Sequence, residues 1–194
     1  MVGHLDADCF YVSDERVRHR DLVGKPVGAL GNNGACVIAK SYEMKAQGVK
    51  TATSIWDAKV LCPEGVYVKR DFYWYEVLSR KMLGIVGSFF RTVEYYSIDE
   101  FYFRAEPHAY GQLLSATAIA IRDHIREVAG LPVTIGIART RALAKLSGWR
   151  CVARTSPMGL PRICTSWRLN YAAGKGCNYR CSILWAHARR RLPR

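Results

Sequence analysis

The chain has 194 residues, of which 49% are hydrophobic and 23% charged, a composition that excludes a disordered or fibrous protein and allows one medium-sized domain with an added lobe. The formal net charge of +13 predicts an anionic partner such as nucleic acid. No apolar run approaches the ~18 residues of a membrane span, and Asp6 and Asp8 lie where a signal peptide would be basic and then apolar. We therefore expect no membrane association and a cytoplasmic location.

Short apolar runs alternate with amphipathic segments through residues 1–147, which predicts strands alternating with helices. Strands are expected at 2–7, 26–30, 35–39, 66–69, 92–96, 100–103 and 132–138. Helices are expected at 10–19, 41–47, 54–61, 72–89, 110–129 and from 141 to at least 146. Gly48 is expected to end the second helix, and Asp71 to cap the fourth. Two long helices behind a sheet favour an α+β layered fold over a helix bundle.

Two acidic clusters lie at the ends of apolar strands, where carboxylates gain nothing from packing. The first contains Asp6 and Asp8, the second Asp99 and Glu100, and neighbouring strands in one sheet would bring them together. Two ionised carboxylates ~4 Å apart repel by about 4 kcal/mol at an effective dielectric of ~20, so such a cluster requires a cation or a raised pKa. Oxygen ligands of this kind favour Mg²⁺, and two such ions can clamp the oxygens of a phosphoryl transfer.

The alternative is that strand-end acids are turn residues or helix caps, and Asp8 in particular fits a cap of the following helix. The five histidines show no metal-ligand spacing, so surface or core roles are expected for them; they are His4, His19, His108, His124 and His187.

Five ordered motifs extend across residues 5–146. They are LDADCFYVS at 5–13, GKPV at 24–27 with CVIAK at 36–40, SYEMKA at 41–46 with GVK at 48–50, YSIDE at 96–100, and TIGIA at 134–138 with LAKL at 143–146. In this order the motifs resemble those of the Y-family translesion DNA polymerases, and most closely the UmuC-like branch. YSIDE is the most distinctive of them.

The resemblance implies a polymerase palm with inserted fingers. The palm would comprise residues 1–9 and 71–147, a sheet backed by two long helices, and the fingers residues 10–70. The implied reaction is template-directed nucleotidyl transfer on primer–template DNA with a deoxynucleoside triphosphate, in DNA repair by translesion synthesis. Two Mg²⁺ ions are implied as cofactors.

The roles of individual residues also follow from the resemblance. The catalytic metal ligands would be the carboxylates of Asp6, Asp99 and Glu100, with the backbone carbonyl of Ala7 as a further ligand. The residues matched to nucleotide binding are Tyr11, a steric gate under the incoming sugar, with Tyr42 and Lys45 at the triphosphate, and Phe10. Ordinary core packing is the alternative for the three aromatic residues, and Phe10 fits the core in either case.

Lys145 has two open interpretations. It could approach a phosphate of the primer or triphosphate, or it could simply cover the last helix of the body.

Residues 148–194 differ from the rest in composition and are expected to form an irregular basic tail. They contain nine Arg, one Lys and no acid, whereas residues 1–147 contain 19 basic and 16 acidic side chains. The resemblance ends near residue 146, and the change suits a frameshift or truncation. A basic arm that binds phosphates is the competing interpretation. The cysteines at 151, 164, 177 and 181 lack the paired spacing that favours a zinc site.

Two other functions remain open from the sequence. The chain could be a catalytically inactive remnant that at most binds nucleotide or DNA. It could also be a nucleotide cyclase on a similar palm, which, unlike a polymerase, would require no template.

Overall fold

The computed structural model describes residues 1–106, 114–152 and 164–165. The strands are β1 (Val2–Ala7), β2 (Val27–Leu30), β3 (Val37–Lys40), β4 (Val66–Lys69), β5 (Val93–Tyr95), β6 (Glu100–Arg104), β7 (Val133–Ala138) and β8 (Cys164–Thr165). The helices are α1 (Phe10–Arg18), a short 3₁₀ turn η1 (Arg20–Leu22), α2 (Tyr42–Ala46), α3 (Ile55–Leu61), α4 (Phe72–Phe89), α5 (Leu114–Ala129) and α6 (Arg141–Val152). The predicted mixture of strands and helices is confirmed.

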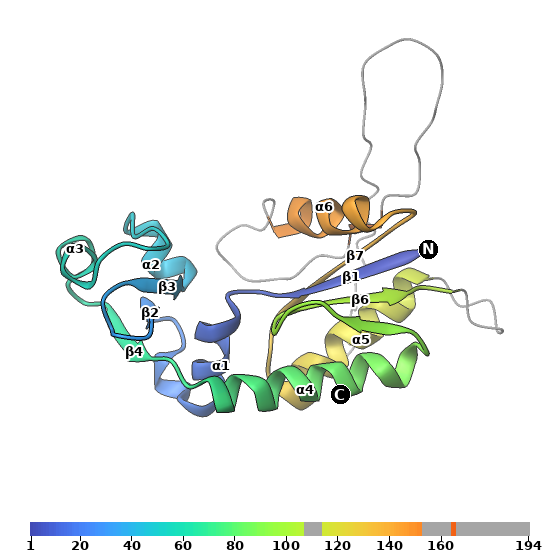
Figure 1. Cartoon of the computed structure of the whole chain (residues 1–194), viewed down its shortest axis with the longest axis horizontal. Coiled ribbons are helices and arrows are strands. Elements are labelled where there is room, and N and C mark those ends of the chain that lie inside the picture. Colours follow the sequence, from blue (N-terminus) through green and yellow to red (C-terminus); the bar gives the residue numbers. More distant parts are fainter. Residues whose placement is uncertain (107–113, 153–163, 166–194) are drawn as a thin grey trace, which may run out of the picture.

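The larger of two sheets has the strand order β5-β6-β1-β7-β8, with β1 antiparallel to both β6 and β7. Helices α4 and α5 cover one face of this sheet, and α6 lies on the other (Figure 1). We call these elements the larger lobe. The two long helices behind the sheet are those that the sequence predicts.

A smaller lobe consists of the sheet β3-β2-β4 with α2 and α3. It lies at one end of the molecule, and α1 lies between it and the larger lobe (Figure 1). The two lobes suit the predicted palm and fingers, whose boundaries stay a prediction.

Apolar side chains in alternate strand positions form the core of the larger lobe. Leu5, Phe101 and Ile135 come from three adjacent strands and are fully buried against the two long helices. Burying one such side chain contributes roughly 1.5–3 kcal/mol. Because side chains alternate along a strand, the residues between these three point to the opposite face, the one that carries α6.

Side-chain caps fix where the helices begin. Asp71 Oδ1 accepts a hydrogen bond from Trp74 N at 3.2 Å, which confirms the predicted cap of α4. Ser41 and Ser54 cap α2 and α3 in the same way. Gly48 follows α2 with a positive φ of 87° and donates its N–H to Lys45 O, so it ends the helix as predicted.

The boundary predicted near residue 147 stays a prediction. Helix α6 continues to Val152, past the change in composition, and the two-residue strand β8 pairs in parallel with β7 where no strand is predicted. Backbone hydrogen bonds to a sheet edge need no apolar periodicity, so the sequence carries no signal for β8. None of the helices in the described part of the chain combines the length and the apolar character that a membrane span requires.

Candidate functional site

The antiparallel pairing of β1 and β6 brings the two acidic clusters together. Asp6 pairs with Glu100 in the register of the two strands, and both side chains lie on the α6 face of the sheet. Ala7 N donates a hydrogen bond to the carbonyl of Asp99 at 3.0 Å, so Asp99 lies beside the end of β1. The structure thus brings Asp6 and Glu100 together at one end of the central strand and places the backbone of Asp99 beside them.

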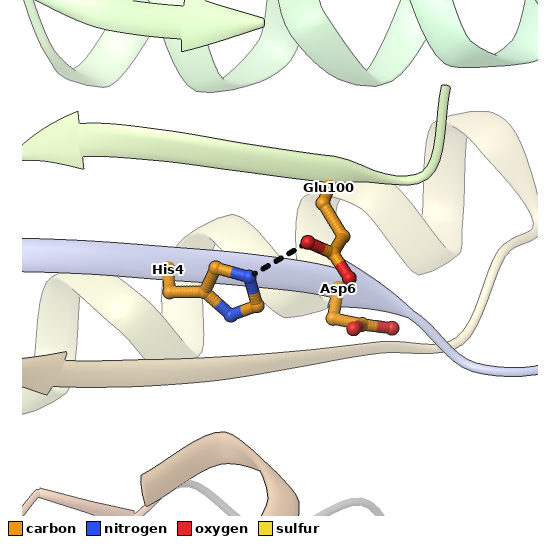
Figure 2. A group of neighbouring side chains, drawn as sticks. All are labelled: His4, Asp6 and Glu100. Atoms are coloured by element: carbon orange, nitrogen blue, oxygen red, sulfur yellow. Dashed lines mark hydrogen bonds and ion pairs between the residues drawn. The ribbon is translucent and has the colours of Figure 1, made fainter. Parts of the chain in front are cut away.

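A histidine belongs to the same cluster. The ligand atoms of His4, Asp6 and Glu100 lie within 4.8 Å of one another (Figure 2). Asp99 is not in that group; its Oδ1 accepts a hydrogen bond from Ser97 Oγ at 2.6 Å. His4 is 1% exposed, and its Nε2 is 3.5 Å from Glu100 Oε2.

The burial of His4 agrees with the core role that was one of the two expectations for it, but neither expectation places it beside the carboxylates. Histidine spacing along the chain was the wrong signal, because the partners of His4 are carboxylates on two strands. The useful signal was the period of two along β1, which puts His4 on the same face as Asp6.

The electrostatics of the cluster favour a cation. Burial, followed by repulsion from Glu100 and Asp99, raises the pKa of Asp6 to about 7. For Glu100, burial acts in the same upward direction, but hydrogen bonds from Lys145 and His4 outweigh it and hold its pKa below the ordinary value. A carboxylate that is costly to ionise among other carboxylates is stabilised when a metal ion binds beside it.

Lys145 reaches the cluster from α6, which lies on the same face of the sheet as Asp6 and Glu100. Its Nζ donates to both carboxylate oxygens of Glu100, at 2.9 and 2.7 Å. The ammonium also lies 5.7 Å from the centre of the Tyr96 ring. Lys145 therefore does more than cover its helix: it is an ion-pair partner of a predicted metal ligand.

Asp8 does not cap α1. The residue before this helix is Cys9, which has a left-handed φ of 49° and makes no side-chain cap. Asp8 instead accepts a hydrogen bond from Thr134 Oγ1 on β7 at 3.0 Å, and burial raises the pKa of its carboxyl to about 6. The alternative role for Asp8 was wrong because the strand β7, distant in sequence, supplies a partner.

An aromatic cluster lies between α1 and α4. The ring of Tyr11 is 4.9 Å from that of Tyr75 and 6.1 Å from that of Phe72. Burial, followed by the negative charge of Asp99, raises the pKa of Tyr11. Phe10 is 4% exposed in the core of the larger lobe. This burial supports the core interpretation of Phe10 and leaves little of the ring for a nucleotide.

Tyr42 and Lys45 are exposed on α2, the helix of the smaller lobe that follows β3. Arg16 of α1 holds this helix through a 3.0 Å hydrogen bond to Glu43. Partial burial of the Tyr42 hydroxyl, followed by electrostatic interactions with Cys9 and Asp8, raises its pKa. The role of Tyr42 and Lys45 at the triphosphate stays a prediction.

The four cysteines considered as zinc ligands, at 151, 164, 177 and 181, lie outside the residues whose side chains the structure describes.

The chain belongs to the impB/mucB/samB family, whose model matches residues 5–148. It is 33% identical over 150 residues to DNA polymerase IV of Oceanobacillus iheyensis, a match that covers 76% of this chain and 36% of that protein. It is 38% identical over 146 residues to DNA polymerase IV 2 of Mesorhizobium japonicum, covering 74% of this chain and 34% of the relative. The chain therefore spans about a third of the length of these curated relatives.

Solved structures of Y-family polymerases share the fold. The crystal structure of DinB from Sulfolobus solfataricus superposes with a TM-score of 0.74 at 26% identity, covering 84% of this chain and 48% of that one. The insertion ternary complex of Dbh DNA polymerase superposes with a TM-score of 0.73 at 27% identity, covering 77% and 46%. These likenesses confirm the predicted polymerase family and fold class. Membership of the UmuC-like branch stays a prediction.

Proposed function

We propose that this chain carries the nucleotidyl-transfer centre of a Y-family DNA polymerase. The reaction would add a deoxynucleotide to a primer 3′-hydroxyl opposite a template base, in repair by translesion synthesis. The observation that carries the proposal is the pairing of Asp6 with Glu100 across β1 and β6, beside Asp99, in a chain whose relatives are named DNA polymerase IV.

The donor set fits Mg²⁺. The oxygen atoms of Asp6, Asp99 and Glu100, with the carbonyl of Ala7, are hard ligands of the kind that this ion prefers. Burial, followed by repulsion from Glu100 and Asp99, raises the pKa of Asp6 to about 7 even though Lys145 acts to lower it, so a cation that binds beside Asp6 would stabilise its ionised form. When bound, two Mg²⁺ ions would neutralise triphosphate charge and favour ionisation of the primer hydroxyl.

The remaining residues of the site would position the substrates. Tyr11, fixed by the rings of Phe72 and Tyr75, would lie under the incoming sugar and exclude a 2′-hydroxyl. Tyr42 and Lys45 would bind the triphosphate, Lys45 through its charge. Positioning of this kind, together with electrostatic stabilisation, supplies most of the rate in phosphoryl transfer.

The proposed domains follow from these roles. Residues 1–9 and 71–147 would form a palm that holds the carboxylates, and residues 10–70 would form fingers that cover the nucleotide. Partners of the reaction would be primer–template DNA and a deoxynucleoside triphosphate.

Primer extension by the purified 194-residue protein tests the proposal. We expect Mg²⁺-dependent extension of a primed template that is abolished by Asp99→Ala, because that change removes one of the metal carboxylates. Undiminished extension by Asp99→Ala would contradict the assigned site. Nucleotide binding without extension would support the inactive remnant, and product formation without a template would support the cyclase.

A further inference from the structure

Glu100 is held from two sides by donors that come from different elements. Lys145 approaches from α6 and bonds both carboxylate oxygens. His4 approaches along the sheet from β1, and the edge of its ring that carries Nε2 points toward Glu100 and Asp6 (Figure 2). The separation of His4 Nε2 from Glu100 Oε2 is 3.5 Å.

The chemistry of the pair fixes the direction of the hydrogen bond. An ionised carboxylate only accepts, so His4 Nε2 must carry the hydrogen. Within the described part of the chain, Nδ1 of the same ring is buried with no hydrogen-bond partner. The polar function of the ring is therefore directed at Glu100.

Packing does not explain a histidine at this position. The side chain is 1% exposed, and its ring lies 4.7 Å from that of Tyr102, whose other contacts include the guanidinium of Arg141 at 4.3 Å. A buried polar atom without a partner costs free energy, and an apolar ring in the same space would avoid that cost. Histidine at position 4 therefore stabilises the fold less than an apolar ring of similar size would.

We infer that His4 is a positioning residue that holds the carboxylate of Glu100 toward Asp6 for a divalent cation. The inference rests on the proposed function. Ligating carboxylates are commonly oriented by hydrogen bonds from residues behind them, and loss of such a partner typically costs about 10- to 100-fold in metal affinity.

His4 and Lys145 differ in what they do when a cation arrives. An ammonium beside Glu100 repels an incoming metal ion and competes with it for the same oxygens. An imidazole can donate its hydrogen bond without a net charge, so it can keep Glu100 in place while the metal binds. The positioning role therefore belongs to His4 rather than to the stronger ion pair.

Two polar variants of His4 test whether metal binding depends on the position of the hydrogen-bond donor or only on the packing of the side chain. Glutamine can present its amide near the place of Nε2, whereas asparagine presents its amide near the place of Nδ1, away from Glu100. Mn²⁺ alone is titrated into the full chain, and free Mn²⁺ is measured by electron paramagnetic resonance. We expect His4→Gln to bind close to wild type and His4→Asn to bind about 10- to 100-fold more weakly.

A third variant and a control keep the test decisive. His4→Phe should weaken Mn²⁺ binding as His4→Asn does while matching or exceeding the wild-type melting temperature, because it removes a buried unpaired nitrogen. Thr117→Val removes another buried unpaired atom, on α5 behind the opposite face of the sheet, and should leave Mn²⁺ affinity unchanged.

Equal affinities for wild type and His4→Asn would overturn the inference, and so would equal losses in His4→Gln and His4→Asn. Equal Mn²⁺ affinities for wild type and Glu100→Gln would instead contradict the assignment of the metal site, and with it the proposed function.

Discussion

Asp14 on α1 has a fully buried carboxyl group, and no described residue gives either of its oxygens a hydrogen bond. Burial, followed by repulsion from Glu15 and Asp99, raises its pKa to about 9. In the unfolded chain the pKa would be about 3.9, so between those values the folded protein keeps a proton that the unfolded chain releases. The free energy of unfolding therefore falls as pH rises through this window.

We expect Asp14→Asn to gain stability over wild type as pH rises, by up to about 1.4 kcal/mol per pH unit between about pH 5 and pH 8. Urea unfolding of both proteins across this range measures the difference. The exposed Asp21→Asn serves as the control and should shift stability by the same amount at each pH. A constant difference between wild type and Asp14→Asn would mean that the carboxyl is already ionised in the fold.

The raised pKa of Asp6 leads to a second prediction, which concerns how metal affinity depends on pH. Its pKa of about 7 means that a cation must displace a proton in mildly acidic solution. Mn²⁺ affinity should thus rise about tenfold per pH unit below ~7 and level off above it. Calorimetric titration of Mn²⁺ between about pH 5.5 and 8 checks this expectation.

Two variants test whether that pH dependence comes from the carboxyl group of Asp6. Asp6→Asn should bind Mn²⁺ weakly and with a flatter pH profile. Asp8→Asn should shift the profile only slightly toward lower pH, because Asp8 comes after burial, Glu100 and Asp99 among the causes that raise the pKa of Asp6, and its carboxyl bonds Thr134 on a different strand. An affinity independent of pH in the wild-type protein would show that Asp6 titrates well below neutrality.

At the scale of elements, the contact of α6 with β7 determines where Lys145 lies. A Cβ atom on Gly136 would come within 2.1 Å of Ala144 O, a backbone atom of α6 that cannot move without the helix. Gly136→Ala should therefore displace α6, cost about 1–3 kcal/mol and weaken the Lys145–Glu100 ion pair. Guanidinium unfolding gives the stability.

Gly84 on α4 provides the matched control for that substitution. A Cβ there meets no atom within 4 Å, and the residue is exposed in a helix. Gly84→Ala should therefore stabilise the protein by about 0.5–1 kcal/mol. A Gly136→Ala variant as stable as Gly84→Ala would show that α6 moves freely over the sheet.

Elements whose signals are local in the sequence could be predicted well. Strand β1 follows from its apolar run, and α4 from an apolar stripe and its Asp71 cap. The carboxylate cluster follows from acids at strand ends, once β1 and β6 are taken as neighbours. In contrast, the Lys145–Glu100 ion pair depends on how α6 packs on the sheet, and no pattern within α6 specifies that.

His4 shows the same limit at the site. Its identity as a buried donor to Glu100 depends on the face of β1 it occupies and on the partner strand, both tertiary properties. The period of two along β1 can give the face on which His4 lies, but it cannot give the partner strand.

At the scale of the whole molecule, charge and family likeness divide the chain in nearly the same place. The family match ends at residue 148, and the residues from there to 194 have a net charge of +10 against +3 for the rest. If about six of those positive charges pair with phosphates, the logarithm of DNA affinity should fall with the logarithm of salt concentration at a slope near −5. A basic arm that binds DNA should therefore contribute to this salt dependence, whereas a tail of chance composition should not.

Substitution of the three consecutive arginines at 189–191 by serine tests which of the two holds. Each lost phosphate contact should reduce the steepness of the slope by about 0.9, so the triple variant should lose up to about 2.7. Fluorescence anisotropy of a labelled duplex across a series of salt concentrations measures it. The matched control replaces three exposed lysines of the smaller lobe, Lys50, Lys59 and Lys69, with serine. If both triple variants change the slope equally, the DNA-binding charge is spread over the whole chain, and residues 148–194 hold no arm of their own.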